Sequence, residues 1–137
     1  MGSEMCIRDS DTVMPGLVAF DFGDAIRAGA NTAAEDERDL SNVALDIDKF
    51  EAFTRGFLGV DKDALTEAEI DSLAGGALAM TVECGVRFLT DYLDGDKYFS
   101  VDYETHNLVR ARCQLALAKD MIAHFDEMKE IVKKYAE

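Results

Sequence analysis

Apolar residues recur at helical intervals over most of this chain. They stand three or four residues apart through residues 50–57, 70–92 and 108–132, and this spacing places them on one face of a helix. Short breaks rich in Asp and Gly separate the periodic runs. The pattern predicts a mainly α fold, with one short extended segment near the N-terminus.

The extended segment is expected at residues 17–20, because this short apolar run directly follows Pro15-Gly16, a pair typical of turns. A short helix over residues 33–42 is expected next. Thr32 and Glu35 have the spacing of a capping box, in which the Thr hydroxyl accepts a free backbone amide and the Glu reaches back to the cap.

A similar spacing, Asp48 and Glu51, marks the next helix, which should end near Gly59. Its apolar stripe consists of Phe50, Phe53, Thr54 and Phe57. We expect this helix to bury a strongly aromatic face.

Thr66 and Glu69 give the clearest helix start, since Leu65 and Ile70 stand where a hydrophobic staple requires apolar residues. We expect one helix from Thr66 to about Leu93, where an Asp-Gly-Asp sequence ends it. Three glycines in this helix cost about 1 kcal/mol each relative to Ala, so close packing or a cavity should compensate.

Residues 97–104 read as a loop, and a last long helix is expected from about His106. Its buried face is predicted to consist of Leu108, Ala111, Leu115, Ala118, Ile122, Phe125 and Val132. His106 and His124 are distant and form no catalytic or zinc pair, and Cys84 and Cys113 have no metal-type spacing.

The composition narrows the classes of function. A net charge of −14 argues against nucleic-acid binding, which rests on clustered Lys and Arg. No apolar run approaches the roughly 20 residues that span a bilayer, so we expect no membrane partner. Reduced thiols in a chain of this kind suit a cytoplasmic protein.

Residues 1–10 (MGSEMCIRDS) read as translated laboratory DNA. The run can be back-translated into DNA that resembles a transposon-based sequencing adapter, so we exclude it, with Cys6, from fold reasoning. Residues 11–137 are then the native part.

Three segments carry a family resemblance: residues 11–37 (DTVMPGLVAFDFGDAIRAGANTAAEDE), residues 83–92 (ECGVRFLTDY) and residues 106–112 (HNLVRAR). They resemble the aminoglycoside phosphotransferase and choline kinase superfamily, and within it the N-acetylhexosamine 1-kinases. The similarity runs from Asp11 to about Met121. It implies that residues 11–137 are the C-terminal, helical, substrate-binding portion of a protein-kinase-like (α+β) fold.

The resemblance also implies an activity for the parent protein, which would transfer the terminal phosphoryl group of ATP, with Mg²⁺, to the anomeric hydroxyl of an N-acetylhexosamine. The catalytic loop and nucleotide lobe of such kinases have no counterpart in this sequence. The chain alone is therefore expected to be inactive, to bind neither ATP nor Mg²⁺, and to have the missing N-terminal part of the same protein as a partner.

The family's metal-binding segment, Ile-Asp-x-Asp, matches this chain only at its end. Asp11 corresponds to the second Asp of that segment, and the metal ligand itself falls at position 9. Asp9 stands there, but it belongs to the adapter-like run, so it is a match of position alone.

Asp21-Phe22-Gly23 looks like the metal-binding Asp-Phe-Gly of protein kinases. The resemblance implies a different role for Asp21, that of a structural brace beneath the catalytic loop. Asp24 and Arg27 are close enough to pair, and we expect them to shape the active-site floor. Asn31 and Thr32 should cap the following helix.

Glu83, Arg87 and Asp91 are spaced by four residues and so share one helix face. They form either a solvated salt-bridge ladder or, as the resemblance suggests, a sugar site in which Glu83 and Asp91 orient Arg87. Tyr98 either stacks on the sugar or packs its loop onto the long helices.

Two other functions compete with a sugar kinase. The acceptor could be an aminoglycoside, because an acidic chain attracts a polycation. The chain could instead be a non-enzymatic helical interaction module, for which an exposed aromatic face on acidic helices would suffice.

Overall fold

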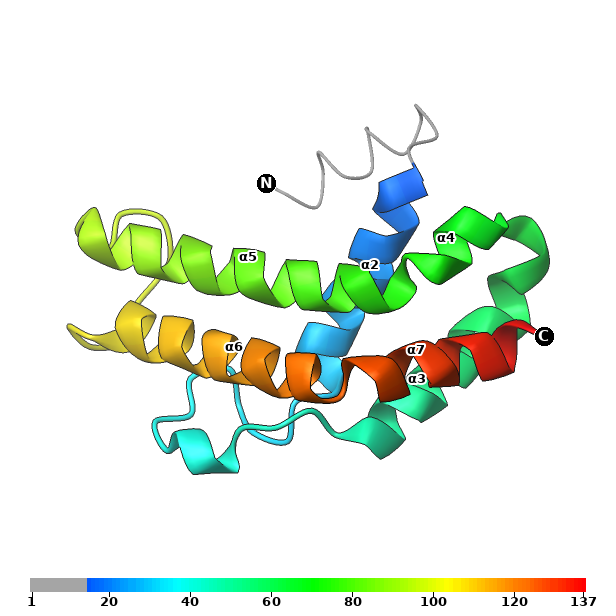
Figure 1. Ribbon diagram of the computed structural model, residues 1–137. Coiled ribbons are helices and arrows are strands. Elements are labelled where there is room, and N and C mark those ends of the chain that lie inside the picture. The colour runs from blue at the N-terminus through cyan, green and yellow to red at the C-terminus, as the bar shows by residue number, and fades with distance from the viewer. Residues whose placement is uncertain (1–14) are drawn as a thin grey trace.

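The computed structural model describes residues 15–137 and is built from helices (Figure 1). In chain order these are α2 (Pro15–Gly29), η1 (Leu40–Asn42), α3 (Ile47–Asp61), η2 (Lys62–Ala64), α4 (Glu67–Asp71), α5 (Leu73–Leu93), α6 (His106–Ala123) and α7 (Phe125–Ala136). The prediction of a mainly α chain is confirmed, and residues 15–137 contain no strand beyond an isolated bridge between Asn31 and Leu45.

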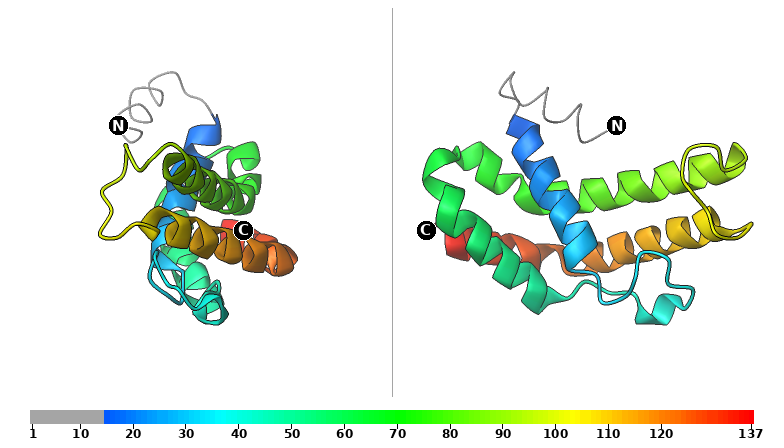
Figure 2. Two further views of the ribbon diagram at one scale, coloured as in Figure 1. Left: turned by 90° about the vertical axis from the view of Figure 1, so that its left-hand side faces the viewer. Right: turned by 180° about the vertical axis from the view of Figure 1, so that it is seen from behind.

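Helices α5 and α6 form a long antiparallel hairpin joined by the loop of residues 94–105 (Figure 1). Helix α2 crosses this hairpin from behind, and α7 continues α6 and packs against α3 (Figure 2). The core lies where these helices meet. Its largest fully buried apolar side chains are Phe22, Phe50, Ile26, Leu58, Leu73, Leu117, Met121 and Met128.

The extended segment predicted at residues 17–20 is wrong, because these residues lie in the first turns of α2. Pro15 is the first helical residue, where its fixed φ and missing N–H cost nothing. Ala19, Phe22 and Ile26 are then buried at helical spacing. The Phe22 ring lies 6.0 Å from the Phe50 ring and 5.2 Å from the Phe57 ring, centroid to centroid.

Two glycines allow α2 and α5 to touch backbone to backbone. A Cβ on Gly76 would lie 2.8 Å from the Ala19 Cβ and closer still to the Ala19 carbonyl, and a Cβ on Gly23 would lie 2.8 Å from the Ala77 nitrogen. The close packing predicted to compensate for glycine in this helix is therefore present at Gly76. Gly75 differs, since a Cβ there would meet nothing within 4 Å.

The helix predicted over residues 33–42 is also wrong. Only the 3-10 turn η1 forms within it, and residues 31–46 make a loop closed by hydrogen bonds from Thr32 N to Ala44 O and from Asp46 N to Ala30 O, at 2.9 and 2.7 Å. The Thr32 hydroxyl donates to Asn42 O and accepts from Ala44 N. It therefore ties the two ends of a loop instead of capping a helix.

The aromatic helix is confirmed as α3, with different ends. Asp46 rather than Asp48 caps it, since its carboxylate accepts the Lys49 amide at 3.1 Å, and the helix continues past Gly59 to Asp61. Phe50 and Thr54 are buried, whereas Phe53 is 41% exposed. The aromatic face is thus only partly covered.

The capping box at Thr66 is confirmed. The Thr66 hydroxyl accepts the Glu69 amide at 3.1 Å, and the Glu69 carboxylate accepts the Thr66 amide at 2.8 Å. The helix that begins there is not continuous, because it breaks at Ser72, whose hydroxyl donates to Glu69 O. The predicted end near Leu93 is confirmed, and Gly95 and Asp96 follow with positive φ.

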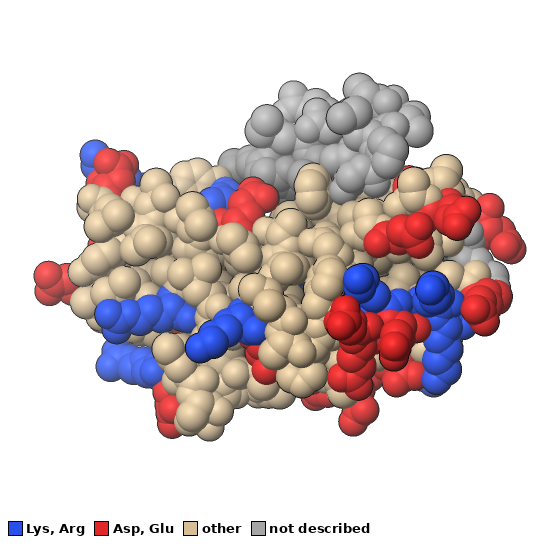
Figure 3. Space-filling view, viewed as in Figure 1, with Lys and Arg blue, Asp and Glu red and all other residues tan. Residues whose placement is uncertain are grey.

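The last helix begins at His106 as predicted, but it breaks at His124 into α6 and α7. Its predicted buried face is partly wrong, since Leu115 and Ile122 are 40% and 62% exposed. The buried face of α6 is rotated toward polar residues, and it consists of His106, Asn107, Ala111, Cys113, Gln114, Leu117, Ala118 and Met121. Figure 3 shows the outer surface over these helices, which is mainly uncharged over α5 and carries Lys and Arg side chains over α6.

Helix α5 is long and apolar enough to cross a membrane, by length and composition alone. This differs from the expectation that no apolar run approaches that length. In the structure α5 is the central helix, packed against both α2 and α6. A helix that packs against neighbours on several sides is apolar on all of those sides, and this alone accounts for the apolar composition of α5.

Candidate functional site

A cleft of about 390 Å³ opens where α2, α5, α6 and two loops meet. Eleven residues line it: Asp24, Arg27, Glu35, Met80, Glu83, Cys84, Arg87, Phe88, Phe99, Ser100 and Arg110. Six of these eleven side chains are charged, three acidic and three basic. A small concave site with converging charged groups and two aromatic rings is typical of ligand pockets.

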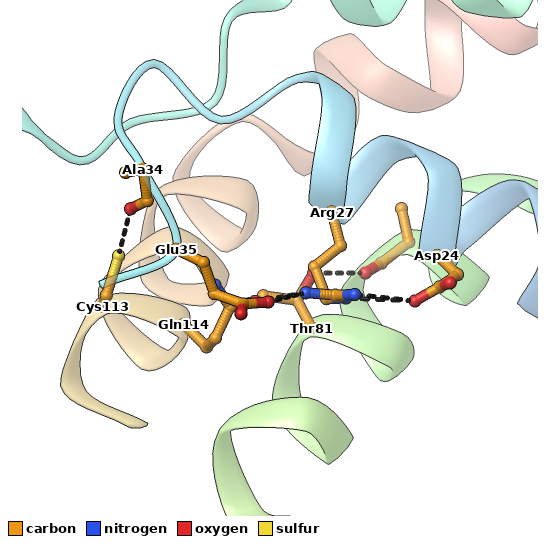
Figure 4. A network of polar contacts seen from close by, with 8 residues as sticks. Asp24, Arg27, Ala34, Glu35, Thr81, Cys113 and Gln114 are labelled. Carbon is orange, nitrogen blue, oxygen red and sulfur yellow. Dashed lines mark hydrogen bonds and ion pairs between the residues drawn. The ribbon is translucent and has the colours of Figure 1, made fainter. Parts of the chain in front are cut away.

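Arg27 is the best anchored of the charged side chains (Figure 4). Its guanidinium contacts the Asp24 carboxylate at 3.0 Å and the Glu35 carboxylate at 2.8 Å, and the side chain is only 14% exposed. Burial opposes its charge, but Cys84, Glu35 and Asp24 together hold the pKa of Arg27 above its usual value. The predicted pairing of Asp24 with Arg27 is confirmed, and both line the cleft.

Arg87 is placed differently, because no ion pair joins it to another residue within the described part of the chain. Its guanidinium lies 5.8 Å from the Tyr98 ring and 5.9 Å from the Phe99 ring. Glu83 also lines the cleft. The three residues of the predicted ladder therefore form no salt bridge with one another.

Asp91 is buried and braces the loop of residues 94–105. Its carboxylate accepts the amides of Tyr98 and Phe99 at 2.8 and 3.0 Å, and the side-chain amide of Asn107 at 2.8 Å. Burial by itself raises the pKa of Asp91, but these hydrogen bonds outweigh it and hold the pKa below its ordinary value of 3.8. Tyr98 is 62% exposed, and neither residue lines the cleft.

His106 connects the two loops that flank the cleft. Its Nδ1 accepts the Asp102 amide at 3.1 Å, so its Nε2 carries the proton and donates to the Asp36 carboxylate at 2.9 Å. This bond lowers the pKa of Asp36. The role predicted for His106, that of starting a helix, is thus joined by a second, structural one. His124 lies at the break between α6 and α7.

The two cysteines differ in position, and only Cys84 lines the cleft. Cys84 lines the cleft, and Cys113 is fully buried with its thiol 3.2 Å from Ala34 O (Figure 4). Burial raises the pKa of both thiols. A raised pKa keeps a thiol protonated at neutral pH, so neither cysteine is activated as a nucleophile.

No group of three or more His, Cys, Asp or Glu side chains within residues 15–137 could hold a metal ion. The predicted metal positions, Asp9 and Asp11, lie outside the described residues. Asp21 is exposed on α2, so its role as a brace stays a prediction.

Sequence reasoning located part of this site. Glu83 and Arg87 line the cleft together with Asp24 and Arg27, while Asp91 and Tyr98 stand outside it. Glu35 and Arg110 were missed as lining residues. Glu35 reaches Arg27 across a loop and Arg110 arrives from another helix, so no helical spacing connects them.

No known protein-family model matches the chain.

Proposed function

We propose that residues 15–137 form the sugar-binding portion of a kinase-like phosphotransferase whose acceptor is an N-acetylhexosamine. One observation carries the proposal. The three sequence segments that resemble such kinases, residues 11–37, 83–92 and 106–112, all contribute to one cleft. They supply eight of its eleven lining residues: Asp24, Arg27, Glu35, Glu83, Cys84, Arg87, Phe88 and Arg110.

The chemistry of the cleft suits a sugar. Carboxylates and guanidinium groups offer directional hydrogen bonds to hydroxyls, and the rings of Phe88 and Phe99, 4.7 Å apart, offer an apolar surface. The three arginines in the cleft balance its three carboxylates, so the cleft lacks the excess negative charge that would attract a polycationic aminoglycoside. The acidity of the whole chain is thus a poor guide to this site.

Binding titrations of the purified chain with N-acetylglucosamine and with kanamycin test the proposal. We expect N-acetylglucosamine to bind and Arg87→Met to weaken binding about tenfold or more, the usual effect of losing a charged hydrogen bond. The matched control is Arg112→Met, since Arg112 is exposed on α6 outside the cleft and should change nothing. Binding of kanamycin alone would overturn the assignment.

The same purified chain tests the expectation that it has no kinase activity by itself. Because the catalytic loop and nucleotide lobe of the family have no counterpart in the sequence, we expect no transfer of phosphoryl from ATP to N-acetylglucosamine. Reading the genomic DNA upstream of Asp11 is the complementary test. A kinase gene should continue there in frame, and an unrelated frame would refute the kinase parent.

A further inference from the structure

The charges in the cleft are divided between two regions. Three of the chain's 14 Lys and Arg residues line it, although the chain carries 28 Asp and Glu residues. In one region Arg27 contacts both Asp24 and Glu35, so this group has a net charge of −1. The remaining lining charges are Arg87, Arg110 and Glu83, with a net charge of +1.

The two arginines of the positive region flank one pair of aromatic rings. Arg110 lies 5.5 Å from the Phe88 ring centroid, and Arg87 lies 5.9 Å from the Phe99 centroid. The Phe88 and Phe99 centroids are themselves 4.7 Å apart. Arg27 lies beside this region and is paired with Asp24 and Glu35, and it reaches Gln114, one helical turn beyond Arg110 on α6.

Neither arginine of the positive region forms an ion pair with a carboxylate of the described chain, although Arg110 is close enough to Asp36 to help lower the pKa of that carboxylate. Arg87 makes only its two ring contacts. Arg110 donates through Nη1 to Ser100 O at 2.9 Å and to Asn107 Oδ1 at 3.0 Å, which fixes its position and leaves Nη2 and Nε for a ligand. Guanidinium groups held in this way bind phosphate and carboxylate oxygens strongly.

We infer that Arg87 and Arg110 form an oxyanion subsite beside the Phe88–Phe99 pair, so that the cleft takes an acidic sugar in preference to a neutral one. Such a ligand is a hexosamine that carries a phosphate or a carboxylate group. Its oxyanion binds the arginines, and its hydroxyls donate to the carboxylates of Asp24 and Glu35. The sugar part of this inference rests on the proposed function, whereas the oxyanion part does not.

Titration calorimetry with four probes tests the inference: inorganic phosphate, N-acetylglucosamine, N-acetylglucosamine 6-phosphate and N-acetylmuramic acid, whose acid group is a carboxylate. We expect both acidic sugars to bind about tenfold or more tightly than N-acetylglucosamine, and their binding to weaken as salt is raised. A preference for one acidic sugar over the other identifies the oxyanion.

Four variants sharpen the result. Arg87→Met should abolish the preference for acidic sugars, and Arg87→Lys should restore part of it. Glu83→Gln should strengthen the binding of acidic sugars, because it removes the one unpaired carboxylate of the positive region. Arg112→Met should match the unaltered chain. Circular dichroism verifies that every variant is folded. The Arg87 side chain contacts the rest of the described chain through two aromatic rings, so we expect its replacement to leave the fold intact.

The outcomes separate the two proposals. If N-acetylglucosamine binds and neither acidic sugar binds more tightly, the oxyanion subsite is wrong and the sugar function stands. If phosphate binds through Arg87 and attaching a sugar adds nothing, the subsite stands and the sugar function is wrong. If none of the four probes binds, both are overturned.

Discussion

Three charged side chains near the cleft differ in what they leave for a ligand. Arg27 is held by two carboxylates and Asp91 by three N–H donors, so the charges of both are already paired within the protein. Within residues 15–137, the Arg87 guanidinium contacts the Tyr98 and Phe99 rings and forms no ion pair. An unpaired guanidinium beside two anchored charges is the group that a ligand can use without breaking an existing bond.

Thr66 provides a prediction at the scale of one residue. Thr66→Ala removes the hydroxyl that accepts the Glu69 amide, and we expect the free energy of unfolding to fall by about 1 kcal/mol. Urea denaturation followed by circular dichroism measures this. Thr90→Ala, at an exposed site within α5, should change stability by less than about 0.5 kcal/mol. Equal losses in both variants would contradict the capping role.

Thr66 and Thr32 also show how far a local pattern can be trusted. Each is followed three residues later by Glu, yet only Thr66 caps a helix. Thr32 and Glu35 are both taken by partners elsewhere, Thr32 by the backbone of residues 42 and 44 and Glu35 by Arg27. A capping box is predictable from sequence only where no tertiary partner competes for its two side chains.

At the scale of elements, buried polar residues explain the errors in helix faces. Three residues on the buried face of α6 are polar, His106, Asn107 and Gln114. His106 and Asn107 bond Asp36, Asp91 and Asp96, and Gln114 accepts from Arg27 at 3.5 Å. A pattern built on apolar residues assigns them to the outside, which rotated the predicted face toward Leu115 and Ile122.

The crossing of α2 and α5 gives a prediction about an element pair. Gly76→Ala places a methyl group against the Ala19 backbone, and we expect a loss of about 1–3 kcal/mol of stability from overpacking. Gly75→Ala is the matched control one residue away, where a Cβ meets open space. It should stabilise the chain by up to about 1 kcal/mol through helix propensity. Thermal unfolding compares the two, and a shift of the same sign in both would refute the close crossing.

At the scale of the whole molecule, the acidic chain places part of its stability in carboxylates with depressed pKa values. The pKa of Asp91 lies below its ordinary value because of the amides that it accepts, and the pKa of Asp36 is lowered by its bond from His106. The unfolded chain therefore binds protons at these two residues at a higher pH than the folded chain does. This stabilisation is fully present above the unfolded pKa and is lost as the pH falls through the folded pKa.

Asp91→Asn tests this linkage. At pH 7 the variant should be less stable than the unaltered chain, because an amide is a weaker acceptor for three donors. The difference should shrink as the pH falls below 3.8, the ordinary pKa value of Asp, because the unfolded chain takes up a proton at Asp91 before the folded chain does. Urea unfolding at fixed ionic strength from pH 7 to pH 3 measures the difference. A gap that stays constant over that range would rule out a charged role for Asp91.

The imidazole of His106 holds one loop through each ring nitrogen, Asp36 on one side and Asp102 on the other. Glu35, next to Asp36, and Ser100, two residues before Asp102, both line the walls of the cleft. The walls are therefore coupled through His106, and the same two loops also meet where the Arg38 guanidinium lies 4.5 Å from the Tyr103 ring. We expect the two walls to move together when the cleft widens, so the lifetime of a bound ligand should depend on how often these contacts between the loops open.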